Sequence, residues 1–419
     1  MIKEAILQDK AEIERIVAQD FIERENLAKY HSDLESPLIK AIMGPRRAGK
    51  SVFSLMLLKG RDFAYVNFDD ENILKIKNYD ELLKAIFSVY HDAKYLFFDE
   101  IQNLDKWELF VNKLHRRGYN LILTGSNANL LSKELATSLT GRYIPIEVFP
   151  FSFKEYLSAR GFLYKDILLP EEKGKLIGHL ESYLLYGGYP EPVTKLLDVK
   201  PYLTTLFEAI LFKDIVKRYK VRFAQDLYNL AIYLISNFCS EYSLNSLKRA
   251  LSFRSVRTVQ KFLGYLEECY LFFSLNRFDY KLKEQLRSPR KIYVTDNGLV
   301  HAVAFGIVPN LGKFMENTVF QWALRKGHRP NRELFYYKTK NKKEIDFVIR
   351  RGINIDSLIQ VCYAMGESKT REREMSALYE ASEELKCDNL MIVTLDTEGT
   401  EIYAGKKFEV KPLWKLLLE

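Results

Sequence analysis

Short apolar runs alternate with polar, helix-compatible stretches along the first 150 residues. Each run is almost continuously apolar, as expected of a strand buried on both faces of a sheet. Strands that alternate with helices predict a parallel sheet. Five strands are predicted, at 37–43, 63–68, 94–98, 120–124 and 143–148. The stretch 3–30 is rich in Glu, Lys, Ala and Ile and predicts a helix that precedes them.

The pattern changes after Pro150. Residues 151–240 carry long amphipathic helical patterns without a strand-like run. Residues 241–295 predict helix, turn, helix and then an apolar strand pair, and from about 310 a helix is followed by strands. A chain of 419 residues exceeds one ordinary core, so two or three domains are expected.

Composition narrows the class of protein. Hydrophobic residues make up 47% and charged residues 28%, which is typical of a globular chain. The net charge of +8 permits nucleic-acid binding without demanding it. The four cysteines are far apart and predict neither a disulfide framework nor a zinc site, which favours a reduced, cytoplasmic setting. No run of about 18 apolar residues exists and the N-terminus has no apolar signal, so we expect no membrane partner.

The segment Gly44–Ser51 matches the phosphate-loop pattern GxxxxGK[ST]. It follows an apolar strand, and the sequence after it can continue as a helix. Glycines admit a backbone whose N–H groups face phosphate oxygens at a helix N-terminus. Lys50 would reach the β- and γ-phosphates, and the Ser51 hydroxyl would bind Mg²⁺. We therefore expect ATP and Mg²⁺ as cofactors, with the nucleotide held by Gly44, Pro45, Arg46, Arg47, Ala48, Gly49, Lys50, Ser51 and Val52.

The predicted strand at 94–98 ends in two carboxylates, Asp99 and Glu100, 49 positions after Lys50 with one strand between. Alone, such an ending would more often be a helix N-cap. Following a phosphate loop, it predicts that Asp99 holds Mg²⁺ and that Glu100 orients and deprotonates the attacking water. This spacing resembles the P-loop ATPases that have an additional strand and a catalytic glutamate.

Five further residues are candidates for contact with the nucleotide or a partner. The strand after Glu100 ends at 123–127, where Asn127, or less favourably Ser126, could hydrogen-bond the water or the γ-phosphate; simple turn residues are the alternative. Arg142 could act on a phosphate in cis, reach a neighbour's nucleotide as an arginine finger, or be a surface group. Arg46 and Arg47 could contact phosphate or a partner.

These motifs resemble those of a family of archaeal and bacterial AAA-type ATPases. The similarity extends over about residues 30–365, and the segments that carry it are 44–51, 97–103 with Trp107, 123–131, 148–153, 186–190 and 211–215. In that family the ATPase precedes a winged-helix region and a region that resembles restriction endonucleases. The resemblance implies an α/β fold: an AAA-type parallel sheet with a helical lid, followed by winged-helix and α+β endonuclease-like domains.

The resemblance also suggests where the domains begin and end. We expect an N-terminal helix at 1–32, the P-loop ATPase core at 33–150, a helical lid or linker domain at 151–235, a winged-helix domain at 236–300 and an endonuclease-like domain at 301–419.

Residues 243–264 predict two short helices joined by a polar turn, which fits a helix-turn-helix. Its second helix and flanks are basic, as duplex DNA would require, and the strand pair near 270–295 fits a wing. The basic residues are Lys248, Arg249, Arg254, Arg257 and Lys261. A winged helix is as often a protein-contact module, so both kinds of partner stay open.

The resemblance implies acidic positions of the restriction-nuclease type at Glu316 and Asp346. Such a nuclease needs a Glu-x-Lys on the next strand, where this chain has Gln360 and Cys362. Glutamine is a weak ligand for a hard metal ion and cysteine carries no positive charge. We therefore expect a degenerate site without nuclease activity.

Together these features predict a Mg²⁺-dependent ATPase that uses ATP to control a contact between its C-terminal half and duplex DNA, a protein partner or another copy of the chain. Two alternatives remain: an ATP-dependent DNA nuclease or nucleic-acid processing enzyme, and a slow nucleotide-gated regulatory switch.

Overall fold

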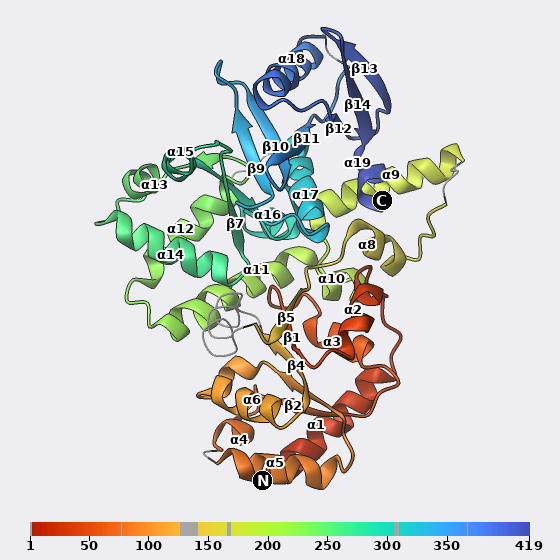
Figure 1. Ribbon diagram of the computed structural model, residues 1–419, viewed down its shortest axis with the longest axis vertical. Helices are drawn as coiled ribbons and strands as arrows, with labels where there is room; N and C mark the ends of the chain where they lie inside the picture. Colours follow the sequence, from red (N-terminus) through yellow and green to blue (C-terminus); the bar gives the residue numbers. More distant parts are fainter. Residues whose placement is uncertain (1, 77, 126–140, 166–168, 306–309, 367) are drawn as a thin grey trace. The chain divides into compact units, whose positions relative to one another are not determined.

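The computed structural model describes residues 2–76, 78–125, 141–165, 169–305, 310–366 and 368–419 (Figure 1). It divides into two compact units. Unit 1 comprises Met1–Pro150 with Glu268–Tyr270, and unit 2 comprises Phe151–Glu267 with Leu271–Glu419. In the described part of the chain, no helix combines the length and the apolar character needed to cross a membrane.

Unit 1 is built on a five-stranded parallel sheet with the strand order β2-β3-β4-β1-β5. All five predicted strands and their parallel arrangement are confirmed. The strands are β1 (Ile39–Met43), β2 (Phe63–Asn67), β3 (Tyr95–Asp99), β4 (Asn120–Gly125) and β5 (Tyr143–Glu147). The additional strand β4 lies between β1 and β3, so the two motif-bearing strands are one strand apart in space.

Helices cover both faces of this sheet. Apolar residues of α1, α2 and α3 form one core with Ile42, Phe97 and Ile122 of the sheet. On the other face, Phe98 of β3 stacks on Phe110 of α6, with ring centroids 5.6 Å apart. The helical elements are α1 (Ile2–Val17), α2 (Leu27–Leu34), α3 (Lys50–Leu57), α4 (Glu71–Leu74), α5 (Tyr79–Val89), the 3-10 turn η1 (Ile101–Asn103) and α6 (Trp107–Arg116).

The single helix expected over 3–30 is wrong. The chain leaves α1 after Val17 and begins α2 at Leu27. Between them the Arg24 guanidinium is buried and donates hydrogen bonds to the carbonyl oxygens of Ala48, at 3.1 Å, and Phe149. This inward turn of the backbone is incompatible with one continuous helix.

Unit 2 begins with a run of helices. They are α8 (Phe153–Ala159), α9 (Pro170–Tyr186), α10 (Pro190–Lys195), α11 (Val199–Ala209), the π-helix η3 (Ile210–Lys217) and α12 (Ala224–Ser236). A small antiparallel sheet of order β6-β8-β7 follows. Its elements in chain order are β6 (Glu241–Tyr242), α13 (Leu244–Ala250), α14 (Val256–Glu268), β7 (Phe272–Asn276), α15 (Leu282–Arg287) and β8 (Arg290–Val294).

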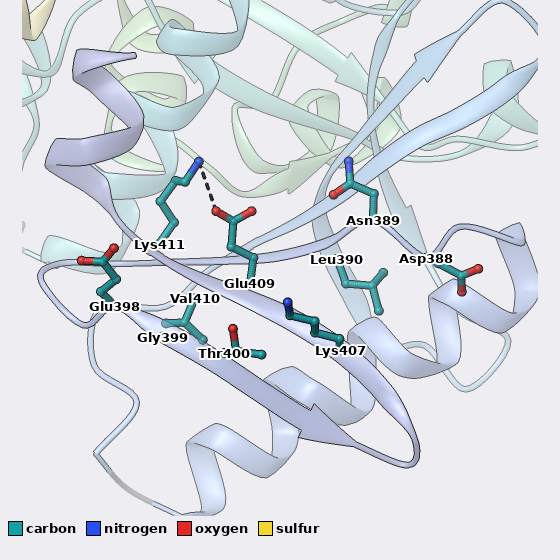
Figure 2. A pocket seen from close by; sticks show the side chains of 10 residues that line it. All are labelled: Asp388, Asn389, Leu390, Glu398, Gly399, Thr400, Lys407, Glu409, Val410 and Lys411. Atoms are coloured by element: carbon teal, nitrogen blue, oxygen red, sulfur yellow. Dashed lines mark ion pairs between the residues drawn. The ribbon is translucent and has the colours of Figure 1, made fainter.

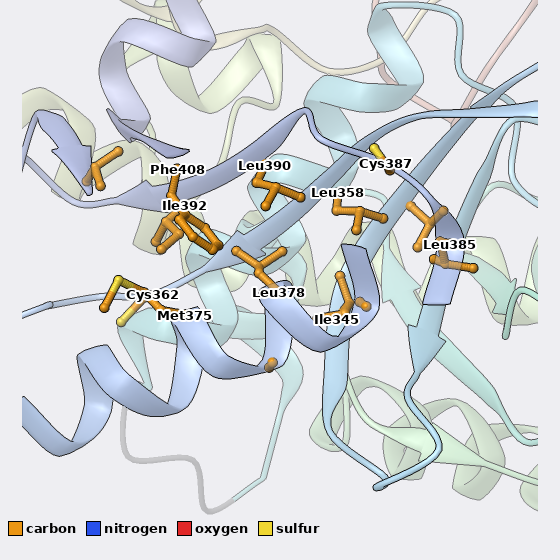
Figure 3. Close-up of a cluster of buried hydrophobic side chains, with 14 of the residues drawn as sticks. Ile345, Leu358, Cys362, Met375, Leu378, Leu385, Cys387, Leu390, Ile392 and Phe408 are labelled. Carbon is orange, nitrogen blue, oxygen red and sulfur yellow. The ribbon is translucent and has the colours of Figure 1, made fainter. Parts of the chain in front are cut away.

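The rest of unit 2 holds a mixed six-stranded sheet of order β13-β14-β12-β11-β10-β9. Helix α18 packs on it through a core that includes Leu378, Leu358 and Ile392 (Figure 3). The elements are α16 (Asn297–Val303), α17 (Leu311–Arg325), β9 (Leu334–Lys338), β10 (Glu344–Arg351), β11 (Asn354–Val361), α18 (Ser368–Leu385), β12 (Leu390–Thr394), β13 (Gly399–Tyr403), β14 (Lys406–Pro412) and α19 (Leu413–Leu418).

Candidate nucleotide site

The loop between β1 and α3 is fixed by close backbone packing. Gly44 has φ +150°, and a Cβ placed there would lie 2.0 Å from the carbonyl oxygen of Val148. Gly49 has φ +91° and immediately precedes α3. Both positions therefore need glycine for reasons of space or backbone conformation. The predicted glycine spacing corresponds to a physical requirement of this loop.

The first turn of α3 is suited to an anion. Gly49 provides no side-chain cap for the N–H groups at the start of the helix, and the helix dipole favours negative charge there. Lys50 is buried, and its ammonium donates to the carbonyl oxygens of Pro45, at 3.0 Å, and Gly44, at 3.3 Å. The lysine is thus held against the same loop, where a phosphate bound by the backbone would meet it.

Asp99 is the centre of a hydrogen-bond network at the carboxyl end of β3. Its Oδ1 accepts from the hydroxyl of Ser51 at 3.0 Å and from that of Thr124, and its Oδ2 accepts from the Tyr65 hydroxyl at 3.0 Å. Burial and the neighbouring charge of Glu100 raise the pKa of Asp99, while these hydrogen bonds oppose the rise. A nearby cation would favour the ionised carboxylate.

The donor set fits Mg²⁺. A serine hydroxyl and a carboxylate, both hard oxygen ligands, meet 3.0 Å apart beside the phosphate loop. This is the pair that the sequence assigned to the metal.

Glu100 follows Asp99 in a left-handed conformation, with φ +51°. Its backbone N–H donates to Oγ1 of Thr124 at 3.0 Å, and its carboxylate accepts a hydrogen bond from the side chain of Gln102. Because Thr124 also contacts Asp99, one hydroxyl ties the ends of β3 and β4 together. The side chain of Glu100 is partly exposed, as a residue that meets substrate water must be.

The other residues predicted to contact the nucleotide differ in their exposure and position. Arg46 is half-buried, and Arg47 is exposed with φ +64°. Val52 lies in the first turn of α3. Ser126 and Asn127 lie outside the described residues, so their role stays a prediction.

Arg142 does not lie with the phosphate loop in this unit. It precedes β5, whose residue Tyr143 is in register with Ile39 at the start of β1, and its carbonyl accepts from the Ile39 N–H at 2.9 Å. The phosphate loop follows the opposite end of β1. In a parallel sheet these are opposite edges, so a cis contact between Arg142 and the same nucleotide is incompatible with the register. Its proposed action on a neighbour's nucleotide stays untested.

Sequence reasoning missed three residues around this site: Tyr65, Thr124 and Arg24. Thr124 carried a signal, because it is a polar residue at the end of an apolar strand. Tyr65 and Arg24 carried none, because only the arrangement of the strands and the loop brings Tyr65 to Asp99 and Arg24 to the carbonyl of Ala48.

The residues predicted to form a degenerate nuclease site are close together in unit 2. The amide N–H of Asp346 donates to the side-chain oxygen of Gln360 at 3.3 Å. Glu316 and Asp346 both accept a hydrogen bond from the ammonium of Lys291, at 2.8 and 3.1 Å. Lys291 was not predicted, since nothing in the local pattern of β8 distinguishes it from a solvated lysine.

A hollow of about 550 Å³ lies at the edge formed by β12, β13 and β14 (Figure 2). Two of its charged side chains, Lys411 and Glu398, form ion pairs. Lys411 is 3.2 Å from Glu409, and Glu398 is 2.5 Å from Lys415. The hollow therefore lacks the convergent set of groups found beside the phosphate loop.

Three family models match parts of the chain. Residues 36–157 match a family model described as an AAA domain. Residues 177–310 and 311–416 match two domains of unknown function, DUF8612 and DUF4143. The uncharacterized protein MJ1544 of Methanocaldococcus jannaschii is 38% identical over 97% of this chain and 95% of its own length. An uncharacterized protein of Haemophilus influenzae is 30% identical over 84% of this chain and 89% of its own length.

Two solved structures are similar to parts of the chain at low sequence identity. The Walker-type ATPase PABY2304 of Pyrococcus abyssi is 16% identical with a TM-score of 0.45, over 68% of this chain and 97% of that chain. The ORC1 protein of Aeropyrum pernix, solved in complex with DNA, is 12% identical with a TM-score of 0.32, over 68% of this chain and 94% of that chain.

Proposed function

The chain belongs to the same family as the Methanocaldococcus jannaschii and Haemophilus influenzae relatives, and its residues 36–157 match an AAA domain. On that premise we propose that the chain is a Mg²⁺-dependent ATPase. The observation that carries the proposal is the hydrogen bond between Ser51 and Asp99, 3.0 Å long, beside Lys50 and Glu100. Four residues with separate roles in phosphate chemistry are thereby gathered from the start of α3 and the end of β3.

Each residue has a defined task in this proposal. The loop amides and Lys50 bind the phosphates, and Ser51 and Asp99 hold Mg²⁺, which would neutralise phosphate charge. Glu100 accepts the proton of the attacking water. Thr124 fixes the backbone of Glu100 relative to Asp99 through its two hydrogen bonds.

Two substitutions test the assignment. Lys50→Ala should lose ATP binding, whereas Glu100→Gln should keep binding and lower the hydrolysis rate by about 10²–10⁴-fold. Binding is measured with a fluorescent ATP analogue and hydrolysis as phosphate release. Lys84→Ala and Glu71→Gln, both at exposed positions of unit 1, are the matched controls and should behave as wild type. A Glu100→Gln protein that hydrolyses ATP at the wild-type rate would exclude Glu100 as the base.

The ATPase is further proposed to control a contact with duplex DNA through α13 and α14. The two helices are joined by residues 251–255 and followed by the antiparallel strands β7 and β8, an order that supports a helix-turn-helix with a wing. Arg249, Arg254, Arg257 and Lys261 are exposed and Lys248 is half-buried. Among the described residues, none of these five side chains forms an ion pair with an acidic group, so their charge is available to phosphates.

Salt dependence of DNA binding tests this contact. Replacing Arg254, Arg257 and Lys261 by alanine should weaken duplex binding and reduce the slope of log K against log salt by roughly 2–3. A control protein with alanine at Arg332, Lys340 and Lys369, exposed residues elsewhere in unit 2, should retain the slope. Equal slopes in both variants would favour a protein partner. ATPase rates with and without duplex DNA separate a DNA-coupled enzyme from a slow nucleotide-gated switch.

A further inference from the structure

Unit 2 contains a buried cation enclosed by carboxylates. The Lys291 side chain projects from β8, and the residue is 1% exposed. Its ammonium lies 2.7 Å from Oε1 of Glu344, 2.8 Å from Oε1 of Glu316 and 3.1 Å from Oδ1 of Asp346. The hydroxyl of Tyr293 donates to the same oxygen of Glu316 at 2.8 Å.

The carboxylates come from elements outside the small sheet. Glu316 is on α17, and Glu344 and Asp346 are on β10. Asp346 is also fixed by its Oδ2, which accepts the Val361 N–H at 3.0 Å. The ammonium therefore connects β8 of the three-stranded sheet to a helix and a strand of the C-terminal α/β region. These include both acidic positions at which a restriction-type nuclease would bind a divalent cation.

The residues present do not fit a divalent cation. A hard metal ion needs several oxygens converging on one open point at about 2.0–2.6 Å. Here an ammonium within hydrogen-bond distance of three carboxylates fills the space between them. In the part of the chain that the structure describes, no group of three His, Cys, Asp or Glu side chains is arranged to hold a metal ion.

The charge on Lys291 is stable. Burial alone would lower its pKa, but Glu316, Tyr293, Asp346 and Glu344 together hold that pKa well above the ordinary value. These neighbours therefore favour the charged form of the Lys291 ammonium. A catalytic lysine of a nuclease would instead stand beside the metal and face a phosphate, which a residue buried to this degree does not.

We infer that Lys291 is a built-in cation that replaces the divalent metal of the nuclease-like site, and that this site serves to fasten the small sheet to the C-terminal α/β region. The inference is independent of the proposed ATPase, because it concerns residues of unit 2 alone. It excludes a metal-dependent nuclease at Glu316 and Asp346.

Binding of Mn²⁺, followed by electron paramagnetic resonance in the nucleotide-free full chain, tests the replacement. Wild type and Asp346→Asn should bind the same number of Mn²⁺ ions, because Asp346 holds none. Lys291→Ala should gain one bound Mn²⁺, and the double variant Lys291→Ala, Asp346→Asn should lose it again. If Asp346→Asn removes a Mn²⁺ ion while Lys291 is in place, the inference is overturned. This comparison stands even where Lys291→Ala fails to fold.

Thermal unfolding tests the fastening role. Lys291→Met should lower Tm by roughly 5–10 °C, because the buried carboxylates of Glu316 and Asp346 lose this partner. Adding Glu316→Gln should recover part of this loss by removing one of the negative charges. Lys283→Met, at an exposed position of α15, is the matched control and should leave Tm unchanged. A Lys291→Met protein with the wild-type Tm would contradict the role.

Discussion

The backbone N–H of Gly188 donates a 2.8 Å hydrogen bond to Oδ2 of Asp296, a residue 108 positions further along the chain. The other carboxylate oxygen of Asp296 accepts from the N–H of Gly298, also at 2.8 Å. One buried carboxylate thus joins the end of α9 to the start of α16. The segment 186–190, which resembled the AAA-type family by sequence, accordingly has a structural role within unit 2.

Gly188→Ala should destabilise unit 2. A Cβ at this position would lie 2.3 Å from the carbonyl oxygen of Phe151. Relieving this overlap would require the backbone to shift, which costs more than the movement of a flexible side chain. We expect a loss of about 1–3 kcal/mol, measured by chemical denaturation. Gly178→Ala is the matched control, because a Cβ in the middle of α9 meets nothing within 4 Å. That variant should gain about 0.5–1 kcal/mol from higher helix propensity. Equal stability of the two variants would contradict the packing argument.

Asp296 should make stability fall as pH rises through the mildly acidic range. Burial raises its pKa to about 6, and the hydrogen bonds from Gly188 and Gly298 oppose that rise. The folded state therefore binds the proton more tightly than the unfolded chain. This contribution is complete below about pH 4 and is lost as pH rises to about 6, amounting to up to about 3 kcal/mol.

Denaturation of wild type and Asp296→Asn at several pH values isolates this effect. The difference in unfolding free energy between the two proteins should change between pH 4 and 6.5, because only wild type can titrate at this position. A difference that stays constant over that interval would show that Asp296 has an ordinary pKa.

Thr124→Val should lower the rate of ATP hydrolysis more than it affects ATP binding. The variant keeps the side-chain shape but removes the acceptor for the Glu100 N–H and the donor to Asp99. We expect a fall in kcat of roughly tenfold or more, since small displacements of a catalytic group are costly. Thr124→Ser restores the hydroxyl and should recover most of the rate in a steady-state assay. A Thr124→Val protein with unaltered kcat would show that Glu100 needs no such support.

Arg24→Ala should weaken ATP binding although Arg24 lies outside the phosphate-loop motif. Its guanidinium donates to the carbonyl of Ala48 at 3.1 Å, so the substitution removes a brace from the loop. We expect KM for ATP to rise by roughly 5–10-fold, as for the loss of one charge-assisted hydrogen bond. Arg15→Ala, at an exposed position of α1, is the control and should bind ATP as wild type does. Unchanged KM in Arg24→Ala would limit the contact to a role in folding.

The sequence alone determined the elements whose signals are local. Continuous apolar runs located all five strands of unit 1, and glycine spacing located the phosphate loop, because burial on both faces and left-handed or crowded backbone leave their marks within a few residues. The Ser51–Asp99 pair followed from these signals, since the carboxyl ends of parallel strands meet at one edge of a sheet.

The tertiary structure decided the features that depend on the order of strands in a sheet and on the burial of side chains. The placement of β4 between β1 and β3 brings Thr124 to Asp99, while the register of β5 takes Arg142 to the opposite edge of the sheet. The carboxylates of α17 and β10 surround Lys291 of β8, so this lysine is a buried cation, which its local sequence does not indicate. Strand order and burial arise from contacts between segments far apart in the chain. A buried charge and a solvated one therefore look alike in the local sequence.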